Sequence, residues 1–148
     1  MTEPADHRRF AVDCFNETWT YLEKDDLAPG EADRMVSTAH ASLYHWLQIG
    51  EPVNFARGHW QVSRAYAVAG VGERAVHHGM RCLEICREHG IGDFDLAFAY
   101  EAVARGYAVA GDRDEAVGFV EKAREAAAAI ADKENRGLVD SDLATIEV

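Results

Sequence analysis

The sequence contains few prolines, few cysteines and no long apolar run. Its three prolines all lie within the first 52 residues, so the rest of the chain is free to form long helices. It has only three cysteines, and its first ten residues carry no apolar segment, which indicates reduced thiols rather than a disulfide framework. No stretch approaches the roughly 18 apolar residues of a membrane span. We therefore expect a cytoplasmic protein without a membrane partner.

Positive charge is also scarce. Lysine and arginine number 15 against 26 aspartates and glutamates, which gives a formal net charge of −11. Binding to a nucleic-acid backbone or to anionic lipid needs clustered lysine and arginine. The composition therefore argues against nucleic acid and membrane surfaces as partners. A chain of 148 residues suits one domain, which we expect to span residues 1–148.

One segment of the chain occurs twice. Residues 64–70 read RAYAVAG, and residues 105–111, 41 positions later, read RGYAVAG. Each copy is followed after four residues by Ala-Val, at 75–76 and at 116–117. In both copies tyrosine recurs with small or aliphatic residues at helical spacing, and a glycine then ends the helix. The pattern predicts two successive helix–turn–helix units.

These residues resemble the tetratricopeptide repeat (TPR), in which an aromatic residue precedes aliphatic and small residues, a tyrosine, a turn glycine and a small residue that opens the second helix. The match covers residues 55–131. His59 and Tyr100 replace the usual tryptophan, no proline closes either unit, and the period of 41 exceeds the usual ~34, as in long-helix variants of the family. The whole chain also resembles a group of short bacterial proteins, which implies no activity and no site residues. The matching positions are His59, Val62, Ser63, Tyr66, Gly70 and Ala75 in the first copy and Tyr100, Val103, Ala104, Tyr107, Gly111 and Ala116 in the second.

The resemblance implies an all-α fold of antiparallel helix pairs stacked as a short right-handed superhelix. We expect the pairs near residues 6–49, 53–89 and 93–131. A capping segment is expected over 133–148, because residues 140–144 (DSDLA) repeat the pattern of residues 93–97 (DFDLA) and the open end of a stacked array needs a cover. Tyr66 and Tyr107 should be equivalent buried residues between helices.

TPR-like folds line a concave groove with the first helix of each pair. If the tyrosine stripe of that helix faces the core, the opposite stripe should face the groove. Arginine and tryptophan are common binding hot spots, and paired arginines suit a carboxylate or another small anion. The competing interpretation is a network without ligand, in which the arginines pair with local carboxylates such as Glu101. The expected groove residues are Arg57, Trp60, Gln61 and Arg64 in one unit and Phe98, Glu101 and Arg105 in the next, with His45 facing them across the turn at Pro52.

Histidine and cysteine positions do not predict a metal site. His40 and His45 are five residues apart and point to different faces of a helix, and His40 fits a hydrogen-bonded core residue. The stripe at 78, 82, 86 and 89 combines two histidines with two cysteines, which are ligands that suit zinc or copper(I). It spans three helical turns, however, and cannot close a tetrahedron around one ion. We expect no metal and no other cofactor.

The sequence favours a binding function over catalysis. It carries no dinucleotide-binding glycine motif, no P-loop, no nucleophile elbow and no C-x-x-C pair. We expect a non-catalytic scaffold whose groove binds a protein or peptide segment or a small anionic ligand. The first alternative is a structural module that associates with itself as a homo-oligomer. The second is an enzyme or a metal-binding protein that uses the histidine-rich segment around His40 and His45.

Overall fold

The computed structural model describes residues 2–148 and folds this part of the chain into seven α-helices without a β-strand, which confirms the all-α class. Within the same residues no helix is both long and apolar enough to span a bilayer. Consecutive helices pair over residues 4–49, 52–88 and 93–128, and a seventh helix follows. The helices are α1 (Pro4–Leu22), α2 (Glu31–Ile49), α3 (Pro52–Val68), α4 (Gly72–Glu88), α5 (Asp93–Ala110), α6 (Arg113–Ala128) and α7 (Lys133–Leu143).

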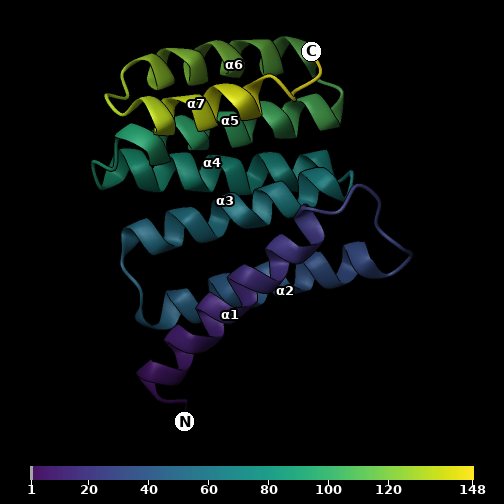
Figure 1. Ribbon diagram of the computed structural model, residues 1–148, viewed down its shortest axis with the longest axis vertical. Coiled ribbons are helices and arrows are strands. Elements are labelled where there is room, and N and C mark those ends of the chain that lie inside the picture. Colours follow the sequence, from purple (N-terminus) through teal and green to yellow (C-terminus); the bar gives the residue numbers. More distant parts are fainter. Residues whose placement is uncertain (1) are drawn as a thin grey trace.

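The helices stack in chain order. Each helix packs against the next, and α1, α3, α5 and α7 also contact one another in sequence. The N-terminus therefore lies at one end of the stack and the C-terminus near the other (Figure 1). The buried apolar residues form three clusters along the stack instead of one central core. This arrangement is compatible with a helical repeat, in which each unit contacts mainly its neighbours.

The repeat seen in the sequence is also present in the structure. Helices α3 and α5 begin 41 residues apart, at Pro52 and Asp93, and α4 and α6 begin the same distance apart, at Gly72 and Arg113. The glycines that end the first helix of each unit, Gly70 and Gly111, adopt φ angles of 81° and 84°. This left-handed conformation is strained for other residues, which explains the glycine at both turns.

The two repeated tyrosines occupy matching environments. The Tyr66 ring stacks on His78 at 5.7 Å between centroids, and the Tyr107 ring stacks on Phe119 at the same 5.7 Å. His78 and Phe119 are themselves 41 residues apart. Both tyrosines are half-buried, whereas the sequence predicted that they were buried. The Tyr66 hydroxyl has a polar partner at its tip, since it is hydrogen-bonded to His40 Nε2 at 3.0 Å.

Two glycines allow α4 and α5 to approach closely. A Cβ atom at Gly79 would lie 3.0 Å from the backbone nitrogen of Val103, and one at Gly106 would lie 2.7 Å from the backbone nitrogen of Val76. Each glycine thus faces the backbone of the other helix. The interface has no room for a methyl group, because backbone atoms cannot move aside as a flexible side chain can.

We expect Gly106→Ala to destabilise the protein by about 1–3 kcal/mol, since overpacking against the α4 backbone outweighs the ~1 kcal/mol that alanine gains over glycine in a helix. Gly118→Ala, in α6, is the matched control, because a Cβ there meets nothing within 4 Å. It should stabilise the protein by up to ~1 kcal/mol. Urea unfolding of the two variants measures both effects, and changes of the same sign would contradict this packing.

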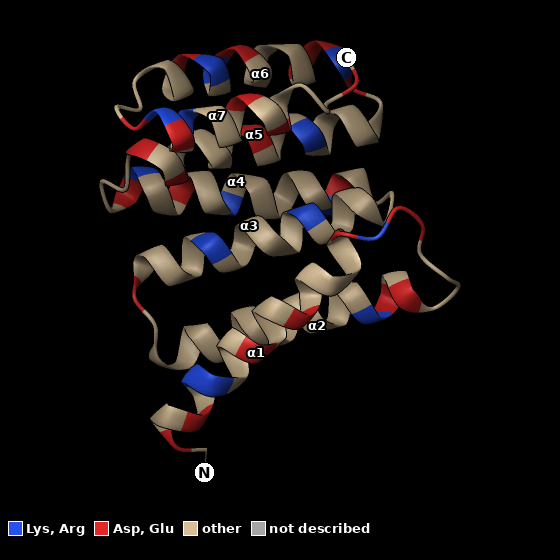
Figure 2. Cartoon of the chain, in the orientation of Figure 1, with Lys and Arg blue, Asp and Glu red and all other residues tan. Residues whose placement is uncertain are grey.

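Charge is interspersed along the stack. Figure 2 shows lysine and arginine scattered singly over most helices, with acidic residues between them and in the loops. Several of the basic residues are held in ion pairs with these carboxylates. The most buried of these pairs are those of Arg64 on α3 and Arg105 on α5 with Glu101.

Candidate functional site

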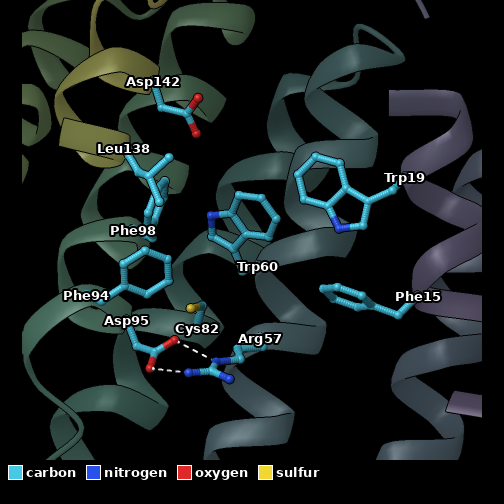
Figure 3. Close-up of a pocket in the computed structure, with 10 residues that line it drawn as sticks. All are labelled: Phe15, Trp19, Arg57, Trp60, Cys82, Phe94, Asp95, Phe98, Leu138 and Asp142. Carbon is cyan, nitrogen blue, oxygen red and sulfur yellow. Dashed lines mark hydrogen bonds and ion pairs between the residues drawn. The ribbon is translucent and has the colours of Figure 1, made fainter. Parts of the chain in front are cut away.

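A pocket of about 480 Å³ opens on the face formed by α1, α3, α5 and α7. Nine of its ten lining residues come from these four helices, and only Cys82 comes from α4. The pocket therefore joins segments that lie far apart in the sequence. Figure 3 shows these side chains around it. They are Phe15 and Trp19 from α1, Arg57 and Trp60 from α3, Cys82 from α4, Phe94, Asp95 and Phe98 from α5, and Leu138 and Asp142 from α7.

Aromatic rings form most of the wall. The Trp60 ring lies between Trp19, at a centroid distance of 5.8 Å, and Phe98, at 5.9 Å in an edge-to-face arrangement. Phe94 extends this wall, with its centroid 4.7 Å from that of Phe98. Phe94 and Phe98 point the same way because they are four residues apart in α5. The wall is thus apolar and built from rings with few rotamers.

An ion pair marks one edge of the pocket. Arg57 donates two parallel hydrogen bonds to Asp95, from Nε to Oδ1 at 2.9 Å and from the guanidinium Nη2 to Oδ2 at 3.0 Å (Figure 3). Two-point pairing of this kind fixes the orientation of both groups. The Arg57 side chain remains 55% exposed, so this pair is screened by water and contributes little to stability.

A second, buried network ties α3, α5 and α7 together. The carboxylate of Glu101, which is 0% exposed, accepts hydrogen bonds from Arg64 at 3.2 Å and from Arg105 at 2.8 Å. Arg64 also donates to the carboxylate of Asp142 at 2.8 Å, while Arg105 donates to the Asp142 carbonyl at 2.9 Å and to Thr145 Oγ1 at 2.7 Å. Each buried guanidinium therefore has anionic or carbonyl partners on two helices.

This network also supports the aromatic wall. The Arg64 guanidinium carbon lies 5.2 Å from the centre of the Trp60 ring, a cation–π distance. Burial by itself lowers the pKa of Arg64, but the neighbouring Glu101 and Asp142 carboxylates outweigh burial and raise the pKa. Arg64 therefore stays charged and holds one face of the indole in place.

The Trp60 indole nitrogen has no hydrogen-bond partner, although it is buried. Figure 3 shows this nitrogen turned toward the side of the pocket where Phe98 and Leu138 lie. A buried donor without an acceptor costs free energy, so most such groups in proteins are paired. The unmet donor at this wall is a distinctive polar feature of an otherwise apolar surface.

No protein-family model, curated protein or solved structure matches the chain. A function for the chain therefore has to be inferred from the geometry and chemistry of the pocket.

Three of the predicted groove residues line this pocket. These are Arg57, Trp60 and Phe98, while Arg64 and Arg105 lie beside it in the buried network, with side chains 16% and 15% exposed. Glu101 was expected on an open groove but is fully buried beneath these two arginines. The reason is that α7 packs on α5 and supplies Asp142 to the network, which covers the stripe that would otherwise be open.

Two predicted residues lie elsewhere. Gln61 is fully buried and donates to the Phe15 carbonyl at 2.9 Å, because α1 packs over this side of α3. His45 does not face Arg57 and Arg64. Its Nδ1 lies 2.8 Å from that of His7, and its ring packs against Phe10 and Tyr44, so its neighbours belong to α1 and α2.

The sequence did not single out the contributions of α1 and α7. Trp19 and Phe15 are four residues apart, a spacing that could have indicated a shared aromatic face. The repeated segments DFDLA and DSDLA could have indicated the carboxylates of Asp95 and Asp142. Asp95 and Asp142 occupy the same place in these segments, and each pairs with an arginine of α3.

A cluster of histidines between α2, α3 and α4 was also missed as a unit. His78 is 6% exposed, and its ring contacts those of His40, His59 and His77 at 5.0–5.3 Å. His40 is hydrogen-bonded to the Tyr66 hydroxyl at 3.0 Å, as expected of a core histidine. Burial and the nearby Arg81 lower the pKa of His59 to about 4, and burial and His59 lower the pKa of His78 to about 3. Both rings are therefore neutral at pH 7.

The histidines and cysteines at positions 78, 82, 86 and 89 lie on α4 and at its C-cap. Within residues 2–148 no three histidine, cysteine or acidic side chains are arranged to share an ion. Cys82 and Cys86 are buried in the apolar cluster between α3, α4 and α5. A hydrogen bond with Cys86 and burial raise the pKa of Cys82, which keeps the thiol at the pocket protonated at neutral pH. It is a poor nucleophile in that form.

Proposed function

We propose that this chain is a short TPR-like scaffold, a right-handed superhelix of three helix pairs closed by α7, and that it binds a partner without catalysing a reaction. The 41-residue recurrence of helix starts supports the repeat architecture. The helices that line the pocket support it as well, because nine of the ten lining residues come from α1, α3, α5 and α7. In TPR-like arrays these are the helices that line the groove.

The observation that carries the proposal is the pocket itself. Its volume of about 480 Å³ falls within the 300–1,000 Å³ typical of ligand pockets, and its wall is largely aromatic. Such a surface gains free energy by taking an apolar group out of water. We propose that the partner, a protein or peptide segment or a small molecule, inserts an apolar group between Trp19, Trp60 and Phe94.

The charged groups at the pocket support binding over catalysis. Asp95, Asp142 and Glu101 each accept at least one hydrogen bond from an arginine, and the Cys82 thiol stays protonated. A general base or nucleophile needs a free and suitably tuned group. The arginines are engaged as well, so an anionic partner would have to compete with their carboxylates. Arg57 is the most exposed of them and offers the best site for such contact.

Nile red, a neutral dye that fluoresces in apolar surroundings, tests this proposal. We expect saturable binding of one dye per chain, weakened about tenfold in Leu138→Asn, because the exposed rim of the pocket loses apolar contact. Leu47→Asn is the matched control. Leu47 is 50% exposed and Leu138 51%, but Leu47 lies on α2, outside the pocket. Absence of binding, or equal loss in both variants, would show that the pocket is not the binding site.

A further inference from the structure

The charges around the pocket compensate one another. Three arginines, at positions 57, 64 and 105, are matched by three carboxylates, at 95, 101 and 142, through direct ion pairs. A ligand with a net charge would therefore bring an uncompensated charge into an apolar space or break one of these pairs. Both outcomes cost free energy. The charge balance thus favours a neutral ligand.

One donor in the aromatic wall of the pocket is both buried and unpaired. The buried Trp60 Nε1–H has no acceptor within the described residues 2–148, and it is a donor only. A ligand oxygen or nitrogen with a free lone pair would satisfy it. Leu138 lies on the side of the pocket toward which this nitrogen points in Figure 3, and it is half exposed, so a change of its rotamer can admit such an atom. A ligand without an acceptor would leave the donor unsatisfied.

We propose that the pocket binds a neutral small molecule with a compact apolar body and one hydrogen-bond acceptor, which accepts from Trp60 Nε1–H. This inference rests on the proposed function and adds the ligand class. The pocket volume suits a small molecule, and the aromatic wall holds its apolar body against Trp19 and Phe94. The Arg64 guanidinium over Trp60 fixes the direction in which the donor points.

Two probes of nearly equal shape test the acceptor. Acetophenone carries a carbonyl, and ethylbenzene is its counterpart without one. Both are titrated into ¹⁵N-labelled protein while the three indole N–H signals, from Trp19, Trp46 and Trp60, are followed by NMR. We expect both probes to shift the Trp19 signal, and acetophenone to move the Trp60 signal downfield as its hydrogen bond forms. Trp46 does not line the pocket and serves as the internal reference.

Trp60→Phe separates the hydrogen bond from apolar contact, because it removes the donor and keeps a ring. We expect acetophenone to bind about 5–10-fold more weakly to this variant, and ethylbenzene to bind within about twofold of wild type, which also shows that the pocket remains folded. Trp46→Phe is the matched control and should change neither affinity. Equal changes in affinity for both probes in Trp60→Phe would overturn the acceptor assignment. No change for either probe would also overturn it, because the Trp60 N–H would then be satisfied by the nearby edge-to-face Phe98 ring.

Charged probes and a peptide-like probe complete the test. Benzoate and benzylammonium should bind at least tenfold more weakly than acetophenone, and equal or tighter binding of either would overturn the neutral assignment. Tighter binding of N-acetylphenylalanine amide, with the same dependence on Trp60, would assign the pocket to a peptide in place of a small molecule. If no probe shifts Trp19 or Trp60 while Nile red still binds, the ligand class is wrong and the proposed function stands. If Nile red also fails, both are wrong.

Discussion

Replacing Glu101 with glutamine is expected to lower the free energy of unfolding by about 3–5 kcal/mol, the usual cost of removing one partner from a buried ion pair. The Glu101 side chain is 0% exposed and accepts hydrogen bonds from both Arg64 and Arg105. Glutamine has nearly the same size but no charge, so two largely buried guanidinium groups lose their shared carboxylate. Its amide NH2 group would also face at least one of these donors.

Arg57→Gln is the control for this prediction. Arg57 pairs with Asp95 through two hydrogen bonds, but its side chain is 55% exposed, whereas those of Arg64 and Arg105 are 16% and 15% exposed. Exposed ion pairs are typically worth less than about 1 kcal/mol. Urea unfolding should therefore separate the two variants clearly. If Glu101→Gln were as mild as Arg57→Gln, the buried network would not be what holds α3, α5 and α7 together.

Acid is expected to destabilise the protein through its histidine cluster. The pKa values of His59 and His78 in the folded chain, about 4 and about 3, lie below the usual value near 6.5. Between those values the unfolded chain binds more protons than the folded one, so stability falls as the pH decreases from about 6.5 toward 3. Above pH 6.5 both histidines are neutral in the folded and the unfolded chain, so this loss of stability is absent.

His78→Phe tests this pH dependence, and phenylalanine is the residue at the equivalent position 119 of the second unit. Between pH 7 and pH 4.5 the variant should lose about 2 kcal/mol less stability than the wild type, since its ring takes up no proton. The control is His89→Gln, because His89 is exposed and outside the cluster. Parallel stability curves for His78→Phe and wild type would show that His78 does not titrate as described. The groups that surround the cluster and act on its titration include His40, His77, Arg74, Arg81 and Glu84.

Equivalent positions of the two repeat units carry side chains of different chemistry. His59, Tyr66 and His78 in the first unit correspond to Tyr100, Tyr107 and Phe119 in the second. In both units the tyrosine stacks on the third residue at 5.7 Å. The geometry of the pair is therefore kept while one unit is polar and titratable and the other is aromatic. This part of the structure could be predicted from the sequence, because equivalent residues of a repeat adopt equivalent positions.

The candidate site could be predicted from the sequence only in part. Arg57, Trp60 and Phe98 were expected at the groove and line the pocket, whereas Gln61 and Glu101 were expected there and are buried. All five satisfy the same helical spacing. The difference lies in what covers each of them, namely α1 over Gln61, and the two arginines held by α7 over Glu101. Those two helices belong to the parts of the chain where the repeat pattern is weakest.

The local structure of this protein could be predicted from its amino-acid sequence. Helical spacing, the glycines at 70 and 111 and the 41-residue repeat predicted the helices, their turns and the equivalence of the two units, because these depend on residues that are close in the chain. Which helix faces remain exposed depends instead on how distant helices pack against them. Burial depends on partners such as Phe15 and Asp142, which lie 46 and 78 residues from their partners on α3. Local periodicity shows which side chains share a face, but it carries no information about the distant helix that covers that face.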